Sequence, residues 1–375
     1  MSLSFEVLAT SGHARVGLLH TAHGAVQTPA FMPVGTAGTV KALHPEEVAG
    51  TGARMLISNT YHLWLRPGPE LIAEQGGLHR FMRWPHAIAT DSGGFQAFSL
   101  AQRVKVSERG FEFASHLDGS RRLLTPEESM RVQGLLGSDI ALALDICSPA
   151  NVERGELIAG IERTTRWAER CLNARSRGQG LFGIIQGGTD VELRLRHAEA
   201  LGSLPFDGLA LGGFSVGESP QSMYATLDAV VPYVDARRPR YLMGVGTPAD
   251  LVRAMAAGVD VFDCVLPTRN ARNGQAFLAS GRLTLKNARF RNDQRPLDEA
   301  CGCPVCSQGF SRAYIRHLYV AGEILAHRLL SLHNLHTYAS LMAAARRAIQ
   351  EGQFENWARV QLPAAGDAGS ADDCA

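Results

Sequence analysis

One stretch decides how this chain folds: Phe262-Asp263-Cys264-Val265-Leu266-Pro267-Thr268-Arg269-Asn270-Ala271-Arg272-Asn273-Gly274, which follows the run Val259 to Val261. A short apolar run that ends in a carboxylate, and then in Pro, Asn, Gly and two arginines, is typical of a buried strand that stops at a polar rim. The stretch therefore predicts a strand that places Asp263 at such a rim.

Seven more short apolar runs share this pattern. Most are separated by segments of helical periodicity, such as 126–136, 153–175, 191–201 and 248–257. Eight near-continuous apolar strands alternating with helices favour parallel pairing and an α/β fold of the (β/α)8, TIM-type barrel class, with a doubly wound open sheet as the alternative. The eight runs are 30–34, 54–58, 87–91, 139–145, 181–186, 206–213, 241–245 and 259–263.

Polar residues at the carboxyl ends of these runs favour the barrel, because such residues converge on one mouth in that fold. They are Asp91, Asp145, Gln186, Gly212-Gly213, Gly244 and Asp263.

Composition limits the kind of partner. The chain has 375 residues, 45% hydrophobic and 19% charged, so it can bury a large core. Because the formal net charge is only +1, a polyanion would have to bind a local basic patch. Segment 269–295 supplies seven basic residues against Asp293 alone, a local charge of +6. A solvated face on a neutral protein is the plain alternative.

Seven cysteines, an odd number, occur in a chain that shows no amino-terminal signal segment and no run of membrane-spanning length. We therefore expect a cytoplasmic protein with no membrane partner. Three of the cysteines form a Cys-Gly-Cys-Pro-Val-Cys cluster, which in a reducing compartment indicates a metal site. Three thiolates plus one imidazole make a closed set typical of structural zinc. The cysteines are Cys301, Cys303 and Cys306, and the competing imidazoles are His317, His327, His333 and His336.

The segments divide the chain into five predicted parts. Short alternating runs at the start predict a β-hairpin or small sheet, and a hairpin at 104–107 and 111–117 should form an insertion between two barrel strands. A polar end of the chain is expected to be disordered, with Cys374 as a free thiol. The parts are a β-sheet cap (1–30), the barrel (31–275), a zinc-binding subdomain (276–340), a C-terminal barrel helix (341–363) and the tail (364–375).

The residues at the predicted mouth suit a flat, purine-like ligand. The sequence Asp91-Ser92-Gly93-Gly94-Phe95 combines a carboxylate, a glycine pair that a ligand can approach and a ring on which it can stack. A tight strand-to-helix turn with a buried Phe is an equally good interpretation. Asp145 adds another carboxylate, although an aspartate there is often an N-cap, while Gln186 and Gly213 add donors and acceptors for a base edge.

These residues fall in blocks that resemble the bacterial tRNA-guanine transglycosylases, also called queuine tRNA-ribosyltransferases. The resemblance extends from about Phe5 to Tyr338. The blocks are Thr28–Gly35, Asn59–Leu63, Asp91–Gln96, Ser115–Ser120, Phe182–Gly187, Tyr241–Gly246 and Phe262–Arg269.

The resemblance implies exchange of the wobble guanine of tRNAs with a G-U-N anticodon for 7-aminomethyl-7-deazaguanine, in queuosine biosynthesis. Asp263 would be the nucleophile that forms a covalent ribosyl ester, and Asp91 the general acid and base. The other implied base-binding residues are Ser92, Gly93, Gly94, Phe95, Asp145, Gln186, Gly213 and Met243, with the ring sandwiched between Phe95 and Met243.

The resemblance also assigns partners. It selects His333 as the fourth ligand of one structural zinc ion per subunit, with His336 as a minor alternative, and it implies a homodimer formed partly by the zinc region. RNA contacts are expected from Gly244, Val245, Gly246, Thr247, Pro248, Ala249, Asp250, Thr268, Arg269, Asn270, Ala271 and Arg272.

Three departures bear on base preference and on the metal site. Ile146 replaces a common Glu, Phe214-Ser215 replaces a common Leu-Ala, and one extra residue follows Cys306. Val216 and Glu218 keep the bacterial pattern, which favours the aminomethyl precursor over queuine.

Two other functions make different predictions. A non-catalytic RNA-binding relative would lack a catalytic aspartate, whereas both Asp91 and Asp263 are present. A barrel glycoside hydrolase would lack the zinc cluster and the basic segment, whereas this chain has both.

Overall fold

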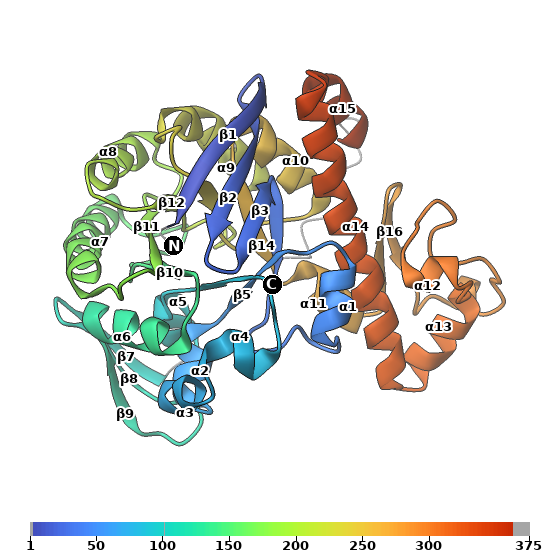
Figure 1. The fold of residues 1–375 in the computed structure, drawn as a ribbon, viewed down its shortest axis with the longest axis horizontal. Helices are drawn as coiled ribbons and strands as arrows, with labels where there is room; N and C mark the ends of the chain where they lie inside the picture. The colour runs from blue at the N-terminus through green and yellow to red at the C-terminus, as the bar shows by residue number, and fades with distance from the viewer. Residues whose placement is uncertain (1–2, 101, 363–375) are drawn as a thin grey trace.

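Eight short parallel strands form the centre of the protein in a computed structural model that describes residues 3–100 and 102–362 (Figure 1). Their order is β4-β14-β13-β12-β11-β10-β6-β5, and a parallel bridge between Val34 and Ile57 joins the two outer strands into a nearly closed barrel. The predicted α/β barrel is confirmed in preference to the open sheet. The strands are β4 (Ala30–Pro33), β5 (Met55–Ser58), β6 (Ala87–Thr90), β10 (Ile140–Leu142), β11 (Gly180–Ile185), β12 (Gly208–Leu211), β13 (Arg240–Leu242) and β14 (Val261–Cys264).

The strands are apolar throughout because both of their faces are buried. All six residues of β11 are buried, for example, and helices surround the barrel in Figure 1. The helix bounds follow local signals: α6 begins after the N-cap Thr125 and ends at Gly137, whose φ of 70° terminates the helix. The helices through the barrel are α1 (Pro45–Gly50), α2 (Thr60–Leu65), α3 (Pro69–Glu74), α4 (Gly77–Met82), α5 (Gly94–Ser99), α6 (Pro126–Leu136), α7 (Arg154–Ala174), α8 (Val191–Gly202), α9 (Pro220–Val230), α10 (Pro248–Ala257) and α11 (Leu266–Arg272).

The amino-terminal segment forms the predicted sheet, with β1 (Ser4–Ser11), β2 (Ala14–Thr21) and β3 (Gly24–Thr28) antiparallel. Leu19 and Val26 of this sheet belong to the same buried cluster as the side chains inside the barrel. A buried ion pair between Arg15 and Asp260 (Nε to Oδ1, 2.8 Å) ties the sheet to the residue before β14. The sheet thus closes the amino end of the barrel.

A second tie at this end is centred on Asp139, just before β10. One of its carboxylate oxygens lies 2.8 Å from His23 Nδ1, and the other lies 3.0 Å from His79 Nε2 and accepts the Ile88 N–H. The two imidazole rings stack with centroids 3.4 Å apart. These groups could surround a cation, but the hydrogen bonds already satisfy the carboxylate, so we interpret the group as a structural tie.

The insertion between β6 and β10 contains the predicted hairpin and one more strand. Its sheet consists of β7 (Gln102–Ser107), β8 (Gly110–Ala114) and β9 (Arg121–Leu124) in antiparallel order. The third strand was not predicted. Gly119, with φ 72°, reverses the chain in the Asp118-Gly119 turn and returns β9 alongside β8.

The C-terminal part begins with the hairpin β15 (Gln275–Leu278) and β16 (Gly281–Thr284), followed by α12 (Pro304–Ser307) and α13 (Arg312–Val320). The long helix α14 (Ile324–Gln350) then packs against α11 and β15, and α15 (Phe354–Gln361) follows it. The predicted boundary at residue 340 falls inside α14, and the domain division stays a prediction. The tail, with Cys374, lies outside the described residues. No helix in the described parts of the chain is long and apolar enough to cross a membrane.

Candidate active site

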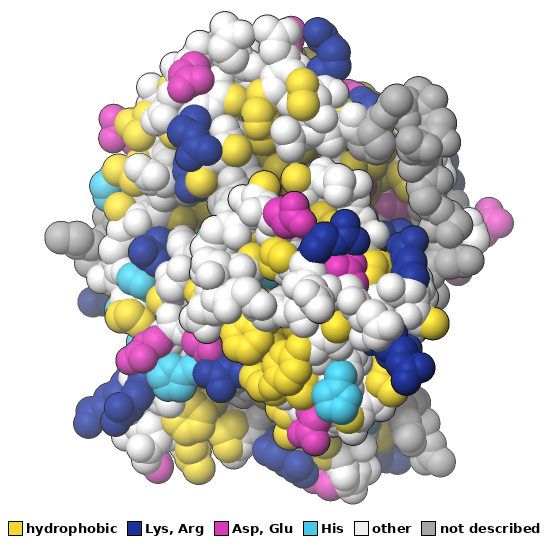
Figure 2. Space-filling model, turned by 90° about the vertical axis from the view of Figure 1, so that its right-hand side faces the viewer, with side chains coloured by type: hydrophobic (Ala, Val, Ile, Leu, Met, Phe, Trp, Pro, Cys, Tyr) yellow, Lys and Arg dark blue, Asp and Glu magenta, His cyan; other side chains and the backbone are white. Residues whose placement is uncertain are grey.

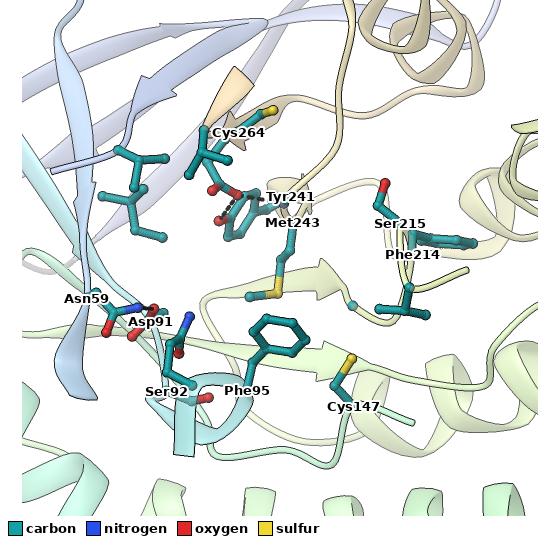
Figure 3. A pocket seen from close by; sticks show the side chains of 18 of the residues that line it. Asn59, Asp91, Ser92, Phe95, Cys147, Phe214, Ser215, Tyr241, Met243 and Cys264 are labelled. Carbon is teal, nitrogen blue, oxygen red and sulfur yellow. Dashed lines mark hydrogen bonds between the residues drawn. The ribbon is translucent and has the colours of Figure 1, made fainter. Parts of the chain in front are cut away.

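A cavity of about 480 Å³ opens at the carboxyl ends of the barrel strands (Figure 3). Most of the residues predicted at the mouth line it, and they come from strands that are far apart in the sequence. Gly93 and Gly94 are buried and do not line the cavity, and a Cβ atom on Gly94 would stand 3.0 Å from Leu144 Cδ1 and 3.3 Å from Phe111 Cε2. The predicted residues that line it are Asp91, Ser92, Phe95, Asp145, Gln186, Gly213, Met243, Gly244, Gly246, Asp250, Asp263 and Arg269.

Asp263, near the end of β14, is fixed by two donors to one carboxylate oxygen. The Tyr241 hydroxyl donates to Oδ1 at 2.6 Å and the Gly244 N–H at 2.8 Å. Burial raises the pKa of Asp263, and the two hydrogen bonds oppose this rise because they favour the carboxylate. Within the described residues no donor contacts Oδ2, which leaves one oxygen of an oriented carboxylate for a ligand in the cavity.

Asp91, directly after β6, is held by three donors. The Asn59 amide donates to Oδ2, and the N–H groups of Thr60 and Gly93 donate to Oδ1 at 2.8 and 3.2 Å. Burial raises the pKa of Asp91 to about 7, and the negative charge of Asp263 adds to the rise. A carboxyl group with such a pKa can give and take a proton near neutral pH.

Asp145, after β10, is linked to its neighbours instead of capping a helix. Ser92 Oγ donates to Oδ1 at 3.2 Å and Gln186 Nε2 donates to Oδ2 at 2.6 Å. Burial raises the pKa of Asp145 to about 6, against the effect of these two donors. The predicted base-binding residues Asp145 and Gln186 therefore form one hydrogen-bonded unit on the wall of the cavity.

Two glycines after β12 allow this unit to lie against the backbone. A Cβ atom on Gly213 would stand 2.3 Å from Gln186 Oε1, and one on Gly212 would stand 2.6 Å from Gln186 Nε2. Gly213 also has a φ of 67°, which side chains disfavour. The pair thus brings accessible peptide groups to the amide of Gln186.

Phe95 and Met243 extend toward each other across the cavity in Figure 3, Phe95 from α5 and Met243 from the end of β13. The Phe95 ring is 48% exposed, so it is not the buried Phe of a simple turn. A planar ligand that enters between them would cover both side chains.

The residues predicted to contact RNA differ in accessibility. Gly244 and Arg269 are exposed at the cavity rim, and Arg272 is half-buried. Thr247 and Asp250 cap α10 through reciprocal hydrogen bonds. The side chains of Val245, Thr268, Asn270 and Ala271 are buried and shape the rim from below.

The cysteine cluster meets one histidine. The sulfur atoms of Cys301, Cys303 and Cys306 lie 3.7, 3.4 and 3.5 Å from His333 Nδ1, and none of the other three candidate histidines joins them. Tetrahedral zinc, with bonds of about 2.3 Å to sulfur and about 2.05 Å to nitrogen, would hold these atoms about 3.5 Å apart. His333 Nε2 lies 2.8 Å from the Phe277 carbonyl, which turns Nδ1 toward the sulfurs. These four side chains fit a metal ion of that size and geometry.

Three supporting residues were not predicted: Tyr241, Asn59 and Arg194. Tyr241 and Asn59 stand in the family-like blocks, but nothing local indicates that they hold the two aspartates. Arg194 lies on α8 at a core position and donates to carbonyls at the end of β11 and after β11 and β12. These roles follow from contacts between elements that are far apart in the sequence.

Comparison with known proteins agrees with this architecture. The sequence profile of the family described as queuine tRNA-ribosyltransferase matches residues 10–364. The chain is 62% identical over 367 residues to the queuine tRNA-ribosyltransferase of Sorangium cellulosum, an alignment that covers 98% of this chain and 93% of the relative. It is 54% identical over 357 residues to the protein of that name from Pelotomaculum thermopropionicum, covering 94% and 96%. The chain therefore belongs to the queuine tRNA-ribosyltransferase family, pentosyltransferases that modify tRNA.

Proposed function

We propose that this protein exchanges the wobble guanine of tRNAs with a G-U-N anticodon for 7-aminomethyl-7-deazaguanine by a double displacement. The observation that carries the proposal is the pairing of two carboxylates on one cavity, one held by two donors to a single oxygen and the other with a pKa near neutrality. Two displacements at the same carbon give retention and require those two roles.

In the first displacement an oxygen of Asp263 attacks C1′ of the wobble ribose. The bond between C1′ and N9 of guanine breaks, its electron pair leaves with the base, and Asp91 gives the base a proton. The ribose is then an ester of Asp263, and Asp91 is a carboxylate. In the second displacement the incoming deazaguanine loses its ring proton to Asp91 and attacks C1′, which frees Asp263.

The cavity walls supply base recognition. Asp145 would accept hydrogen bonds from the ring N–H and the exocyclic amine, while Gln186 and the Gly213 N–H would donate to the carbonyl oxygen. Gln186 must then release or share its present bond to Asp145. The space between Phe95 and Met243 would take the planar ring, a mode suited to a base turned out of its strand.

The tRNA would approach over the rim. Arg269 is exposed beside the cavity, and arginine and lysine side chains lie among hydrophobic ones on the face that carries α12 and α13 (Figure 2). Tyr314, Val320 and Ile324 on α13 and at the start of α14 are 42%, 62% and 76% exposed. We assign the basic side chains to the RNA backbone and the apolar ones to a homodimer contact.

The metal site would hold one zinc ion. Three thiolates and His333 leave no open position, so the ion would have a structural role and would take no part in the displacements. The ion would be held by Cys301, Cys303, Cys306 and His333, and it would cross-link α12 to α14.

Base exchange itself is the direct test. The purified protein should incorporate labelled 7-aminomethyl-7-deazaguanine into an unmodified G-U-N transcript to about one base per tRNA, with release of guanine. A transcript with adenine at the wobble position is the control and should take up none. Equal labelling of both transcripts, or none of either, would contradict the proposal.

The raised pKa of Asp91 predicts that the rate of the first displacement falls on the alkaline side of neutrality. Since the first displacement needs protonated Asp91, the single-turnover rate of guanine release should fall about tenfold per pH unit above about pH 7. A rate profile from pH 5.5 to 9 measures this, and Asp91→Asn should lose both the activity and this pH dependence. Because folding raises the pKa of Asp91 from 3.8 to about 7, the protonated side chain stabilises the folded state at low pH, and this contribution is lost as the pH rises from about 4 to about 7. A flat profile would remove Asp91 as the acid.

A further inference from the structure

Arg194, on α8, is a fully buried cation whose donors all point at backbone. Its exposed fraction is 0%, and within the described residues no salt bridge joins it to a carboxylate, although the charge of Glu218 favours its cationic form. Its guanidinium instead donates to the carbonyls of Gly188 at 2.5 Å, Gly212 at 2.9 Å, Ile185 at 3.3 Å and Gly213 at 3.4 Å. One side chain thus gathers the ends of β11 and β12.

A buried charge is costly, so this one needs a reason to be retained. Burial lowers the pKa of Arg194 to about 9, which still leaves the side chain a cation at neutral pH. Its guanidinium carbon lies 3.8 Å from the centroid of the Phe214 ring. Phe214 also belongs to the cavity wall and is one of the two departures from the common Leu-Ala, so in this chain an aromatic ring packs on the cation beside the cavity.

The peptide between Gly212 and Gly213 connects Arg194 to the ligand. Its carbonyl accepts from Arg194, and its N–H is directed at the Cys147 thiol, which also lines the cavity, so a purine carbonyl would replace that thiol as the acceptor. A charged donor on a carbonyl polarises the peptide and strengthens the N–H as a donor. One turn further along α8, His197 Nδ1 accepts the Gln186 N–H at 2.9 Å, so the same helix fixes both groups proposed to read the base carbonyl.

We infer that Arg194 is a positioning residue for the base site, which orients and polarises the Gly212–Gly213 peptide so that its N–H binds the carbonyl oxygen of the purine. Negative charge collects on the departing purine, including this oxygen, as the glycosidic bond breaks, and the buried cation lies one peptide away from it. The inference rests on the proposed function, because it takes a 6-oxopurine as the ligand of the cavity.

The test compares guanine with 6-thioguanine, which keeps the ring N–H and the amine but replaces the carbonyl oxygen by sulfur, a poorer acceptor. Dissociation constants are measured by calorimetry on the full chain. Wild type should prefer guanine, and Arg194→Met should reduce this preference by roughly tenfold, with Arg194→Lys intermediate. Arg196→Met is the matched control, since Arg196 is exposed on the same helix, and it should leave the preference unchanged.

A residue with only a packing role would weaken the binding of both bases by the same factor. An Arg194→Met variant that keeps the wild-type preference, with or without a loss of affinity for both bases, would therefore overturn the inference. If Arg194→Met does not fold, Arg194→Lys decides by the same ratio. The two proposals fail separately. A wild type that prefers guanine but exchanges no base refutes the exchange reaction alone, whereas a wild type that exchanges bases while the Arg194 variants keep the preference refutes the inference alone.

Discussion

Asp263→Asn should abolish base exchange, by about 10⁴-fold or more, and should remove every covalent tRNA–protein species. The amide has nearly the shape of the carboxylate, and its oxygen can still accept from Tyr241 and Gly244. What it lacks is a nucleophilic oxygen, so the first displacement has no acceptor for the ribose. The measurement is a denaturing gel of acid-quenched protein and labelled tRNA, together with single-turnover release of guanine.

Tyr241→Phe is the matched control for this variant. It removes one of the two donors to Asp263 but keeps the carboxylate, so the covalent species should still form, at a rate lower by about 10²-fold. Because burial raises the pKa of Asp263, Asp263→Asn replaces a buried charge and should not melt below wild type. A covalent tRNA species in Asp263→Asn would show that another residue attacks the ribose.

The barrel was predictable because its signal is local and repeated. Each strand is buried on both faces, which makes it a short apolar run, and each polar residue at a strand end follows such a run directly. The limits of α6 were likewise predictable from the N-cap Thr125 and from Gly137. These features depend on neighbours in the sequence, so one chain suffices to find them.

The supporting residues of the site depend on contacts between distant segments. Tyr241 occurs inside an apolar run and looks like a core residue, and its hydroxyl acquires a role only because β13 pairs with β14. Arg194 occupies a core position of α8, where a charged side chain is not expected, and its acceptors are carbonyls at and after the ends of two strands. Strand β9 was missed because its sequence, Arg-Arg-Leu-Leu, does not alternate apolar and polar residues, and in the described chain its pairing with β8 defines it. Periodicity cannot supply such pairings.

Loss of the metal should unfold the cysteine cluster region but spare the barrel. In Cys303→Ser the zinc content should fall from one ion per chain to nearly none. Since metal binding in small zinc sites contributes on the order of 10 kcal/mol to folding, the region around α12 and α13 should lose its hydrogen-exchange protection. Guanine binding should persist, because no residue of the cluster lines the cavity.

Transfer of the base into tRNA should nevertheless become slower in Cys303→Ser, because α14 joins the cysteine cluster to the rim of the cavity. Next to His333, Asn334 donates to the carbonyls of Pro267 and Gln275, and Tyr338 donates to the Gly246 carbonyl. A loosened α14 would therefore release α11 and the loop after β13, which carry the proposed RNA contacts, and weaken tRNA binding without a matching loss of guanine binding.

His336→Gln, a change three residues along the same helix, should keep the zinc and the tRNA affinity. If His336→Gln lost the zinc and His333→Gln kept it, the ligand assignment would be wrong. If Cys303→Ser bound tRNA as tightly as wild type does, the cluster would have no influence on the rim.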